Sequence, residues 1–328
     1  MSKYILQRLA LFVPVILGIS IVVFVISHLI PGDPVVVMLG QEATAEEIAR
    51  LRSLLGLDQP LPVQYLRWLG RLARGDLGRT LFGGQEVIDL LRMALPATLE
   101  LTVAAFVIGA AVALPLGILS AVHQGSILDF GSMALALLGV SMPVFWLGIM
   151  LILFFSLRLG WLPFNSRGTP VTEAIVGLLS GQGPQPLIAS LRHLALPAVA
   201  LATNLMGPIA RLTRSSMLEV LRQDYVRVAR AKGLSERSVI VRHALKNSLL
   251  PVVTVMGLQF GALLGGAIIT ETVFAWPGVG RLVVTGILQH DYAVSQGGVL
   301  LMALIFSIVN LGVDLSYGYL NPHIRFEE

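Results

Sequence analysis

The sequence predicts an all-α polytopic membrane protein with six transmembrane helices and a basic helix-turn-helix segment between the fourth and fifth. Of its 328 residues, 55% are hydrophobic and only 13% are charged, whereas a soluble domain carries about 25% charged residues. The mean hydropathy is +0.81. This composition argues against a soluble enzyme, and the absence of cysteine excludes disulfides, thiol nucleophiles and cysteine-based metal sites.

Six apolar stretches predict the transmembrane helices. The first runs for 22 residues, and about 20 residues suffice to cross the roughly 30 Å hydrocarbon core of a bilayer. It lacks the shorter core and the small-residue cleavage site of a signal peptide, so we expect it to remain uncleaved. The predicted spans are Leu9–Ile30, Thr98–Val122, Phe130–Leu157, Leu194 to about Ile209, Leu250–Val273 and Val299 to about Leu315.

The spans and the polar segments between them divide the chain into three regions. Residues 1–30 form the N-terminus and the first span, which ends at a Pro-Gly-Asp-Pro sequence because proline cannot continue a helix. Residues 31–97 form a hydrophilic region that we expect to be exported. Residues 98–328 form a five-helix membrane core that includes the basic loop 211–249.

The hydrophilic region from residue 35 to about residue 95 is long and carries balanced charge, so the positive-inside rule, which applies to short loops, does not retain it in the cytoplasm. Within it, Ala45–Leu55 reads as a short amphipathic helix capped by Thr44, and Pro62–Ala73 reads as a second. A second exported loop, rich in Gly and Pro, is expected at residues 158–193.

The basic loop sets the expected orientation of the chain. Between Arg211 and Lys246 there are nine basic and three acidic residues, a local charge of +6 in a chain whose net charge is +4. Short basic loops stay in the cytoplasm. Six spans place both termini on one side, so we expect both termini to be cytoplasmic, in agreement with the basic segment Met1–Arg8.

Helix-end signals predict a hairpin of two helices within this loop. Gly233 is suited to the left-handed residue that ends a helix, Ser235 to the cap of the next helix, and Glu236 to the positive end of that helix's dipole. Ser216 and Glu219 fit a capping box that would start the first helix near Met217. The second helix is expected to bury an apolar face made of Ile240, Val241, Ala244, Leu245 and Leu249.

The fifth span carries small residues at every fourth position. Gly257, Gly261 and Gly265 would let another helix approach closely, either within this chain or in a partner subunit. Gln259, a polar residue at membrane depth, indicates either a packing hydrogen bond or a translocation path. Four charged residues near span ends are expected to reach the interface. They are Glu100, Arg158, Glu271 and Asp314.

Motifs of catalysis, metal binding and nucleotide binding do not occur in the sequence. There is no H-E-x-x-H, no G-x-S-x-G and no G-x-x-x-x-G-K-[ST], and the six histidines are scattered. We therefore expect no catalytic residue, cofactor site or metal site in this chain. If the protein transports a solute actively, the energy must come from another polypeptide, and the basic hairpin is the surface suited to receive it.

Four motifs resemble one family of transporters. The hairpin sequence ARAKG, with Ala229, Ala231 and Gly233, followed by a HALKN run, resembles the EAA coupling loop of ABC importer permeases of the dipeptide/oligopeptide (peptide, nickel, glutathione) family. The segments GDLGRT (Gly75–Thr80), ETVFAWPGVGRL (Glu271–Leu282) and VDLSYGYLNPHIR (Val313–Arg325) resemble the same family. The likeness extends from Ile30 to Arg325.

The resemblance implies a type I importer permease that moves dipeptides or oligopeptides inward across the cytoplasmic (inner) membrane. It implies a second homologous permease, cytoplasmic ATPases that bind the ATP, an exported solute-binding protein and no nucleic acid; membrane lipids surround the spans. The implied ATPase-coupling residues are Asp224, Arg227, Ala229, Arg230, Ala231, Lys232, Gly233, Leu234 and Ser235.

Three alternatives remain open from the residues alone. A membrane-embedded enzyme would need convergent catalytic residues within the spans. A secondary transporter would be expected to show two similar halves with interrupted helices. The basic hairpin itself could instead be held on anionic lipid headgroups, as juxtamembrane basic segments often are.

Overall fold

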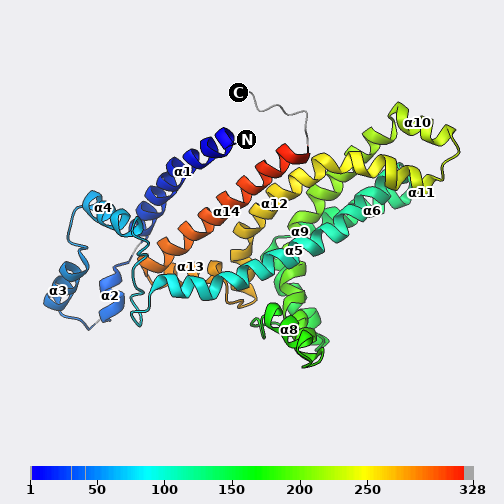
Figure 1. Ribbon diagram of the computed structural model, residues 1–328. Helices are drawn as coiled ribbons and strands as arrows, with labels where there is room; N and C mark the ends of the chain where they lie inside the picture. The colour runs from blue at the N-terminus through cyan, green and yellow to red at the C-terminus, as the bar shows by residue number, and fades with distance from the viewer. Residues whose placement is uncertain (1, 31, 41, 321–328) are drawn as a thin grey trace. The chain divides into compact units, whose positions relative to one another are not determined.

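The computed structural model describes residues 2–30, 32–40 and 42–320, and within these ranges it consists of helices joined by turns and irregular loops, with a single β-bridge between Arg79 and Glu86 (Figure 1). Of residues 2–10 and 314–320, only the backbone is described. The side chains of the basic N-terminal segment and of Asp314, and most of the Val313–Arg325 motif, therefore lie outside the described residues.

Five described helices are long and apolar enough to cross a membrane, and a bent helix pair raises that number to six. The predicted all-α, polytopic membrane class is confirmed. The chain folds as two compact units, which we describe separately. The first unit comprises Met1–Thr98 and Pro277–Ser307, and the second comprises Leu99–Trp276 and Ile308–Glu328.

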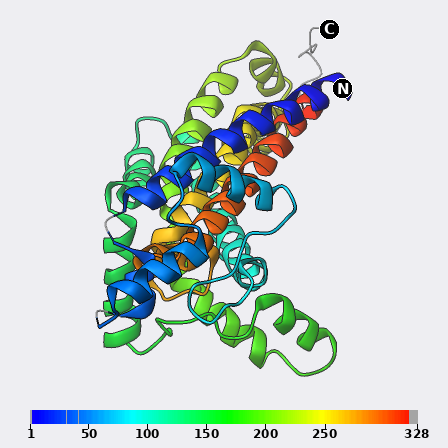
Figure 2. The same ribbon diagram turned by 90° about the vertical axis from the view of Figure 1, so that its left-hand side faces the viewer.

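The first unit combines a membrane span with several short helices. Its helix α1 and the first part of α14 lie side by side, because Phe24 and Leu300 share a buried cluster with Trp68 (Figures 1 and 2). The unit contains α1 (Ser2–Leu29), α2 (Pro34–Leu39), α3 (Ala45–Leu55), α4 (Leu61–Leu72), the start of α5 (Val87–Val122), α13 (Val279–Leu288) and the start of α14 (Tyr292–Leu320).

The two short helices predicted in the hydrophilic region are confirmed. Helix α3 begins with a complete capping box, in which Thr44 caps the Glu47 amide and the Thr44 backbone N–H donates to the Glu47 carboxylate at 2.9 Å. These hydrogen bonds lower the pKa of Glu47 below its ordinary value. Helix α4 begins one residue before the predicted start. Helix α5 already begins at Val87, inside the predicted hydrophilic region.

A buried aspartate anchors the GDLGRT segment within the first unit. Asp291, only 1% exposed, accepts hydrogen bonds from the Thr80 hydroxyl and from the Leu81 backbone N–H at 2.8 Å. Nearby, Val87 and Val283 belong to a second buried cluster that joins α5, α13 and α14. These contacts fix the segment after α4 against the start of α14.

The second unit is a bundle of long helices. It contains the remainder of α5, α6 (Ile127–Ser141), α7 (Val144–Leu151), the π-helical segment η1 (Ile152–Arg158), α8 (Val171–Leu179), α9 (Gln185–Leu221), α10 (Asp224–Ala231), α11 (Glu236–Ser238), the π-helical segment η2 (Val239–Leu245) and α12 (Lys246–Val273).

The third predicted span is not one straight helix. Helices α6 and α7 meet at an angle of 100°. Pro143 explains the break, because a proline disfavours helical geometry in the residue before it. Met142 is accordingly extended, with φ −100° and ψ 132°. The sequence showed a continuous apolar run here, and the proline within it decides the geometry.

The fourth span is much longer than predicted. Helix α9 has 37 residues and includes Pro197 and Pro208. Prolines are tolerated in membrane helices because neighbouring groups satisfy the freed backbone carbonyls. As a result, the loop expected at residues 158–193 is interrupted by α8 and ends where α9 begins. Gly207 and Leu205 lie on buried faces of α9, deep in the bundle.

Glycines on α5 allow close contact with α9. A Cβ atom on Gly117 would lie 2.6 Å from the Ala210 carbonyl oxygen and 2.6 Å from Cβ of Thr213. A Cβ atom on Gly109 would lie 2.7 Å from Leu205. These distances are shorter than van der Waals contact, so the two helices touch through backbone, as small residues permit in lipid.

We predict that Gly117→Ala destabilises the protein by about 1–3 kcal/mol, because the added methyl meets a backbone oxygen that cannot rotate away. Gly131→Ala in α6 is the matched control, since a methyl group added there would meet no atom within 4 Å. The measurement is the thermal midpoint of purified protein in one detergent. Equal midpoints for the two variants would contradict the close α5–α9 contact.

Candidate functional site

The basic hairpin is the site that the sequence singled out, and it lies at one end of the second unit, opposite α8 (Figure 1). Its first helix is α10, which starts at Asp224. The prediction of a start near Met217 was wrong, because α9 continues to Leu221 and Ser216 is buried inside it, only 8% exposed. A buried serine within a continuous helix has no free N-terminus to cap.

The turn between the two helices is closed as predicted. Gly233 has φ 76°, the left-handed conformation. The Gly233 N–H donates to the Arg230 carbonyl at 2.9 Å, and the Leu234 N–H donates to the Ala229 carbonyl at 3.4 Å. This pair of hydrogen bonds is the Schellman motif, which satisfies the last carbonyls of a helix. Lys232 is the C-cap residue, directly before the glycine.

The start of the second helix differs from the prediction. Ser235 occupies the N-cap position, but its side chain makes no capping hydrogen bond. Glu236 instead accepts hydrogen bonds from Arg230, whose Nη2 lies 2.7 Å from Oε1. The ion pair bridges the turn from one helix to the other. Both side chains are about half exposed, so the pair contributes modestly to stability.

The apolar face of the second helix is also displaced. Residues Val239–Leu245 are π-helical, and the wider i→i+5 repeat changes which positions face inward. Val239 and Ala244 are buried, whereas Val241, predicted to be buried, is 53% exposed. The α-helical spacing used for the prediction does not apply to this turn.

Two small apolar clusters fix the hairpin to the long helices. Val226, Ala229 and Val239 are buried together against the last residues of α9. Directly beneath them, Met217 and Ala244 form a second cluster with Ala121 of α5. The hairpin is therefore packed onto the ends of α9 and α5, and it does not hang from them as a loose loop.

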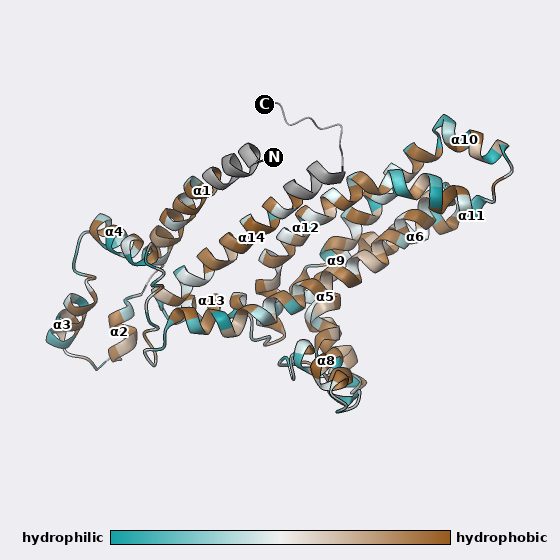
Figure 3. Ribbon diagram, viewed as in Figure 1, coloured by the Kyte–Doolittle hydropathy of each residue, from teal (hydrophilic) through white to brown (hydrophobic). Residues whose placement is uncertain are grey.

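Hydrophilic and hydrophobic residues are interspersed along the hairpin (Figure 3), and several of both kinds are exposed. Tyr225, Val228 and Leu234 are each between 42% and 51% exposed. Exposed apolar side chains grouped among charges are typical of protein contact surfaces. The exposed charged residues of the hairpin are Arg222, Asp224, Arg227, Arg230, Lys232, Glu236, Arg237, Arg242 and Lys246. Asp224 forms an ion pair with Arg227, and Ala231 is the last residue of α10.

The candidate residues of α12 do not form one uniform contact. A Cβ atom on Gly257 would lie 2.6 Å from Val313, so this glycine packs tightly within the chain. Gly261 is buried. Gly265 is exposed and has no atom within 4 Å of a Cβ position. Gln259 is half-buried. The structure does not bring these residues together with the hairpin turn.

Two ion pairs between distant segments were missed by the sequence analysis. Arg214 of α9 donates to both carboxylate oxygens of Asp129, at 2.8 Å each, and the Ser120 hydroxyl donates to the same carboxylate. Arg167 pairs with Glu100, and both side chains are about 90% buried. The partners are separated by 85 and 67 residues, so no local pattern signals either pair.

Two charged residues expected at the interface are buried. Glu271 is fully buried, and the Glu100 side chain, 11% exposed, is engaged by Arg167, while its Oε1 has no hydrogen-bond partner among the described residues. Arg158 is exposed, in keeping with its expected position. Among the residues that the structure describes, no group of three or more His, Asp or Glu side chains could hold a metal ion.

Comparison with known proteins assigns the chain to a family along almost its full length. Residues 113–326 match the family described as binding-protein-dependent transport system inner membrane component. Residues 1–102 match the N-terminal membrane component of the same systems.

Curated relatives match this chain from end to end. It is 47% identical to the dipeptide transport system permease protein DppB of Alkalihalophilus pseudofirmus, over 99% of this chain and 100% of that protein. It is 44% identical to the di/tripeptide transport system permease protein DppB of Pseudomonas aeruginosa and to the dipeptide permease DppB of Escherichia coli K12, with 100% of each chain covered.

The fold is also found in a solved structure. An inward-facing form of the MetNI methionine ABC transporter matches with a TM-score of 0.56 and 19% identity, covering 71% of this chain and 97% of that chain. At this identity the likeness concerns the fold alone. The family matches and the full-length relatives lead to one conclusion: the chain belongs to the inner membrane component family of binding-protein-dependent transport systems.

Proposed function

We propose that this chain is the permease subunit of an ATP-driven importer that carries dipeptides or short oligopeptides inward across the cytoplasmic membrane. The names of the full-length relatives support this cargo class. The energy comes from separate ATPase subunits, because the sequence contains no phosphate-binding loop of its own. An exported solute-binding protein delivers the cargo.

The observation that carries the proposal is the construction of the hairpin. Its inner face is buried in clusters shared with α9 and α5, and its turn is closed by hydrogen bonds around Gly233. Its outer face offers Tyr225, Val228 and Leu234 among basic side chains. A rigid element whose outer face binds the ATPase can transmit a movement of that ATPase directly to the long helices.

The same arrangement supports the orientation that we propose. Helix α9 has 37 residues and is about 55 Å long at 1.5 Å per residue, which exceeds the roughly 30 Å hydrocarbon core. Its two ends therefore lie on opposite sides of the membrane. The basic hairpin and both termini are cytoplasmic, and residues 35–95 and the α8 region are exported.

A second permease of the same family completes the translocation path. The open position beside Gly265 and the exposed side chain of Ile269 on α12 provide a surface for it. Gln259 is the polar residue of this helix that we assign to the path. The two permeases form a heterodimer or a homodimer with these faces together.

The proposed orientation predicts the labelling of two matched cysteine variants in this cysteine-free chain. Ser235 in the hairpin and Ser180 at the end of α8 are both exposed serines. In intact cells, Ser180→Cys should react with a membrane-impermeant maleimide, and Ser235→Cys should react only after permeabilisation. Labelling of Ser235→Cys in intact cells at the rate of Ser180→Cys would overturn the orientation.

Coupling predicts that Gly233→Val abolishes peptide transport and peptide-stimulated ATP hydrolysis in the reconstituted importer. A non-glycine residue in the left-handed conformation costs about 1–2 kcal/mol, so hydrogen exchange at the Leu234 amide should accelerate by about 5- to 30-fold. No atom lies within 4 Å of a Cβ at this position, so the effect is conformational and not steric.

Gly233→Asn is the matched control, because asparagine tolerates the left-handed conformation better than valine. It should retain most of the transport and most of the exchange protection. If the hairpin only held lipid headgroups, both variants would transport at the wild-type rate.

Neutralising Arg227 and Arg230 together should weaken ATPase association more at low salt than at high salt, because salt screens the interactions of exposed charges.

A further inference from the structure

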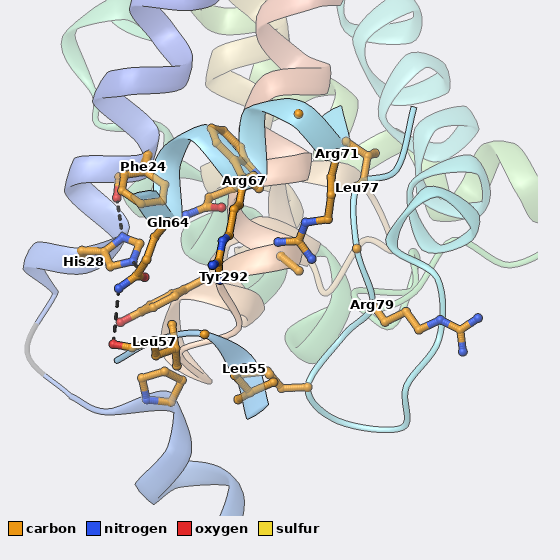
Figure 4. A pocket seen from close by; sticks show the side chains of 18 of the residues that line it. Phe24, His28, Leu55, Leu57, Gln64, Arg67, Arg71, Leu77, Arg79 and Tyr292 are labelled. Carbon is orange, nitrogen blue, oxygen red and sulfur yellow. Dashed lines mark hydrogen bonds between the residues drawn. The ribbon is translucent and has the colours of Figure 1, made fainter. Parts of the chain in front are cut away.

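A cavity of about 670 Å³ lies within the first unit, between α1, α4 and the start of α14 (Figure 4). Figure 4 shows Arg67 and Arg71 extending from α4 into it, above Leu55 and Leu57. This size lies within the range of about 300–1,000 Å³ that is typical of small-molecule sites. The transport role proposed above does not use this cavity.

The charged side chains that line the cavity are all basic. Arg67, Arg71 and Arg74 line it, and no Asp or Glu does. Within the described part of the chain, none of these three arginines forms an ion pair. Arg79 also belongs to the lining, but it pairs with Glu86 and points away from the other arginines in Figure 4. Among the described residues, the cavity therefore presents three exposed arginines and no acidic side chain in its lining.

A buried hydrogen-bond donor at the cavity wall also has no partner. Gln296 on α14 is only 3% exposed, and its Nε2 has no acceptor among the described residues. Native proteins rarely leave such a donor unpaired. Since Gln296 lines the cavity, a ligand oxygen within it would satisfy this donor. The cationic and neutral donors together favour a ligand with several anionic acceptor oxygens, such as a phosphate.

The remaining lining favours a lipid as the source of that phosphate. Phe24 and Trp68 form part of the wall, and Leu54 and Leu55 are 75% and 42% exposed at its edge. Tryptophan is enriched at the membrane interface. The cavity opens beside α1, a candidate membrane span. A zwitterionic peptide fits less well, because no carboxylate is present to receive its ammonium group.

We propose that this cavity binds the phosphate headgroup of an anionic phospholipid, held by Arg67, Arg71, Arg74 and Gln296, with the acyl chains against Leu54 and Leu55. The bound lipid joins α4 to α14 at the exported end of the spans. This proposal is independent of the nature of the transported solute.

The test is native mass spectrometry of the intact transporter, purified in detergent and titrated with phosphatidylglycerol. Arg71→Gln removes one charge-assisted hydrogen bond and should weaken binding by about tenfold. Arg50→Gln is the matched control, since Arg50 is an exposed arginine of α3 that does not line the cavity. Its affinity for the lipid should equal that of the wild type.

Gln296→Met tests the unpaired donor without changing the charge. It should lower the affinity for phosphatidylglycerol several-fold and leave the melting temperature in phosphatidylcholine unchanged, because methionine is similar in size and removes an unsatisfied group. Equal affinities in Arg71→Gln and Arg50→Gln would overturn the proposal. Free glycerol phosphate is the second arm, and binding as tight as that of the lipid would assign the cavity to a soluble anion instead.

Discussion

The structure depends on backbone-to-backbone contact between α5 and α9. In the hydrocarbon core the hydrophobic effect does not drive helices together, because lipid tails are as apolar as the side chains. Helix association there relies on close packing. Gly109 and Gly117 provide it by letting α9 approach α5 until a methyl group would no longer fit. Helix α9 is the central helix of its unit, because it has buried residues along nearly its whole length, from Ser190 to Met217.

The hairpin is held rigid by its packing against helix α9. A helix of eight residues such as α10 has little stability on its own. It persists because Val226 and Ala229 are buried against the end of α9, and because the Schellman turn fixes the path of the chain into α11. A load applied to the outer face therefore reaches α9 and α5 through packed side chains and not through a flexible linker.

Local signals in the sequence predicted local features well. Thr44 and Gly233 were identified because capping depends on residues within one helical turn, and the structure has both features. Pro143 is a local signal for the 100° bend at Met142. The continuous apolar run around it nevertheless led to the prediction of a single span. The π-helical register of Val239–Leu245 had no local signal in the sequence, and its buried Ala244 packs against Ala121 and Met217, which are distant in the sequence.

Ion pairing between distant residues was beyond sequence reasoning for the same physical reason. Asp129 lies at the start of α6 and Arg214 near the end of α9, and they meet only because the bundle brings them together. Removing Arg214 would leave the buried Asp129 charge uncompensated, although such pairs add little to net stability. The Asp129 carboxylate also accepts hydrogen bonds from Ser120 of α5 and from the Gly125 amide.

This carboxylate therefore ties α5, α6 and α9 together one turn away from the Met217 cluster that supports the hairpin. The bidentate geometry of Arg214 fixes both the position and the rotation of the helix that carries it. Apolar contacts are non-directional, so they permit one helix to shift along another. A bidentate ion pair has a fixed geometry and opposes such a shift. The pair thus acts as a positioning contact, which keeps the base of the hairpin in register with the bundle.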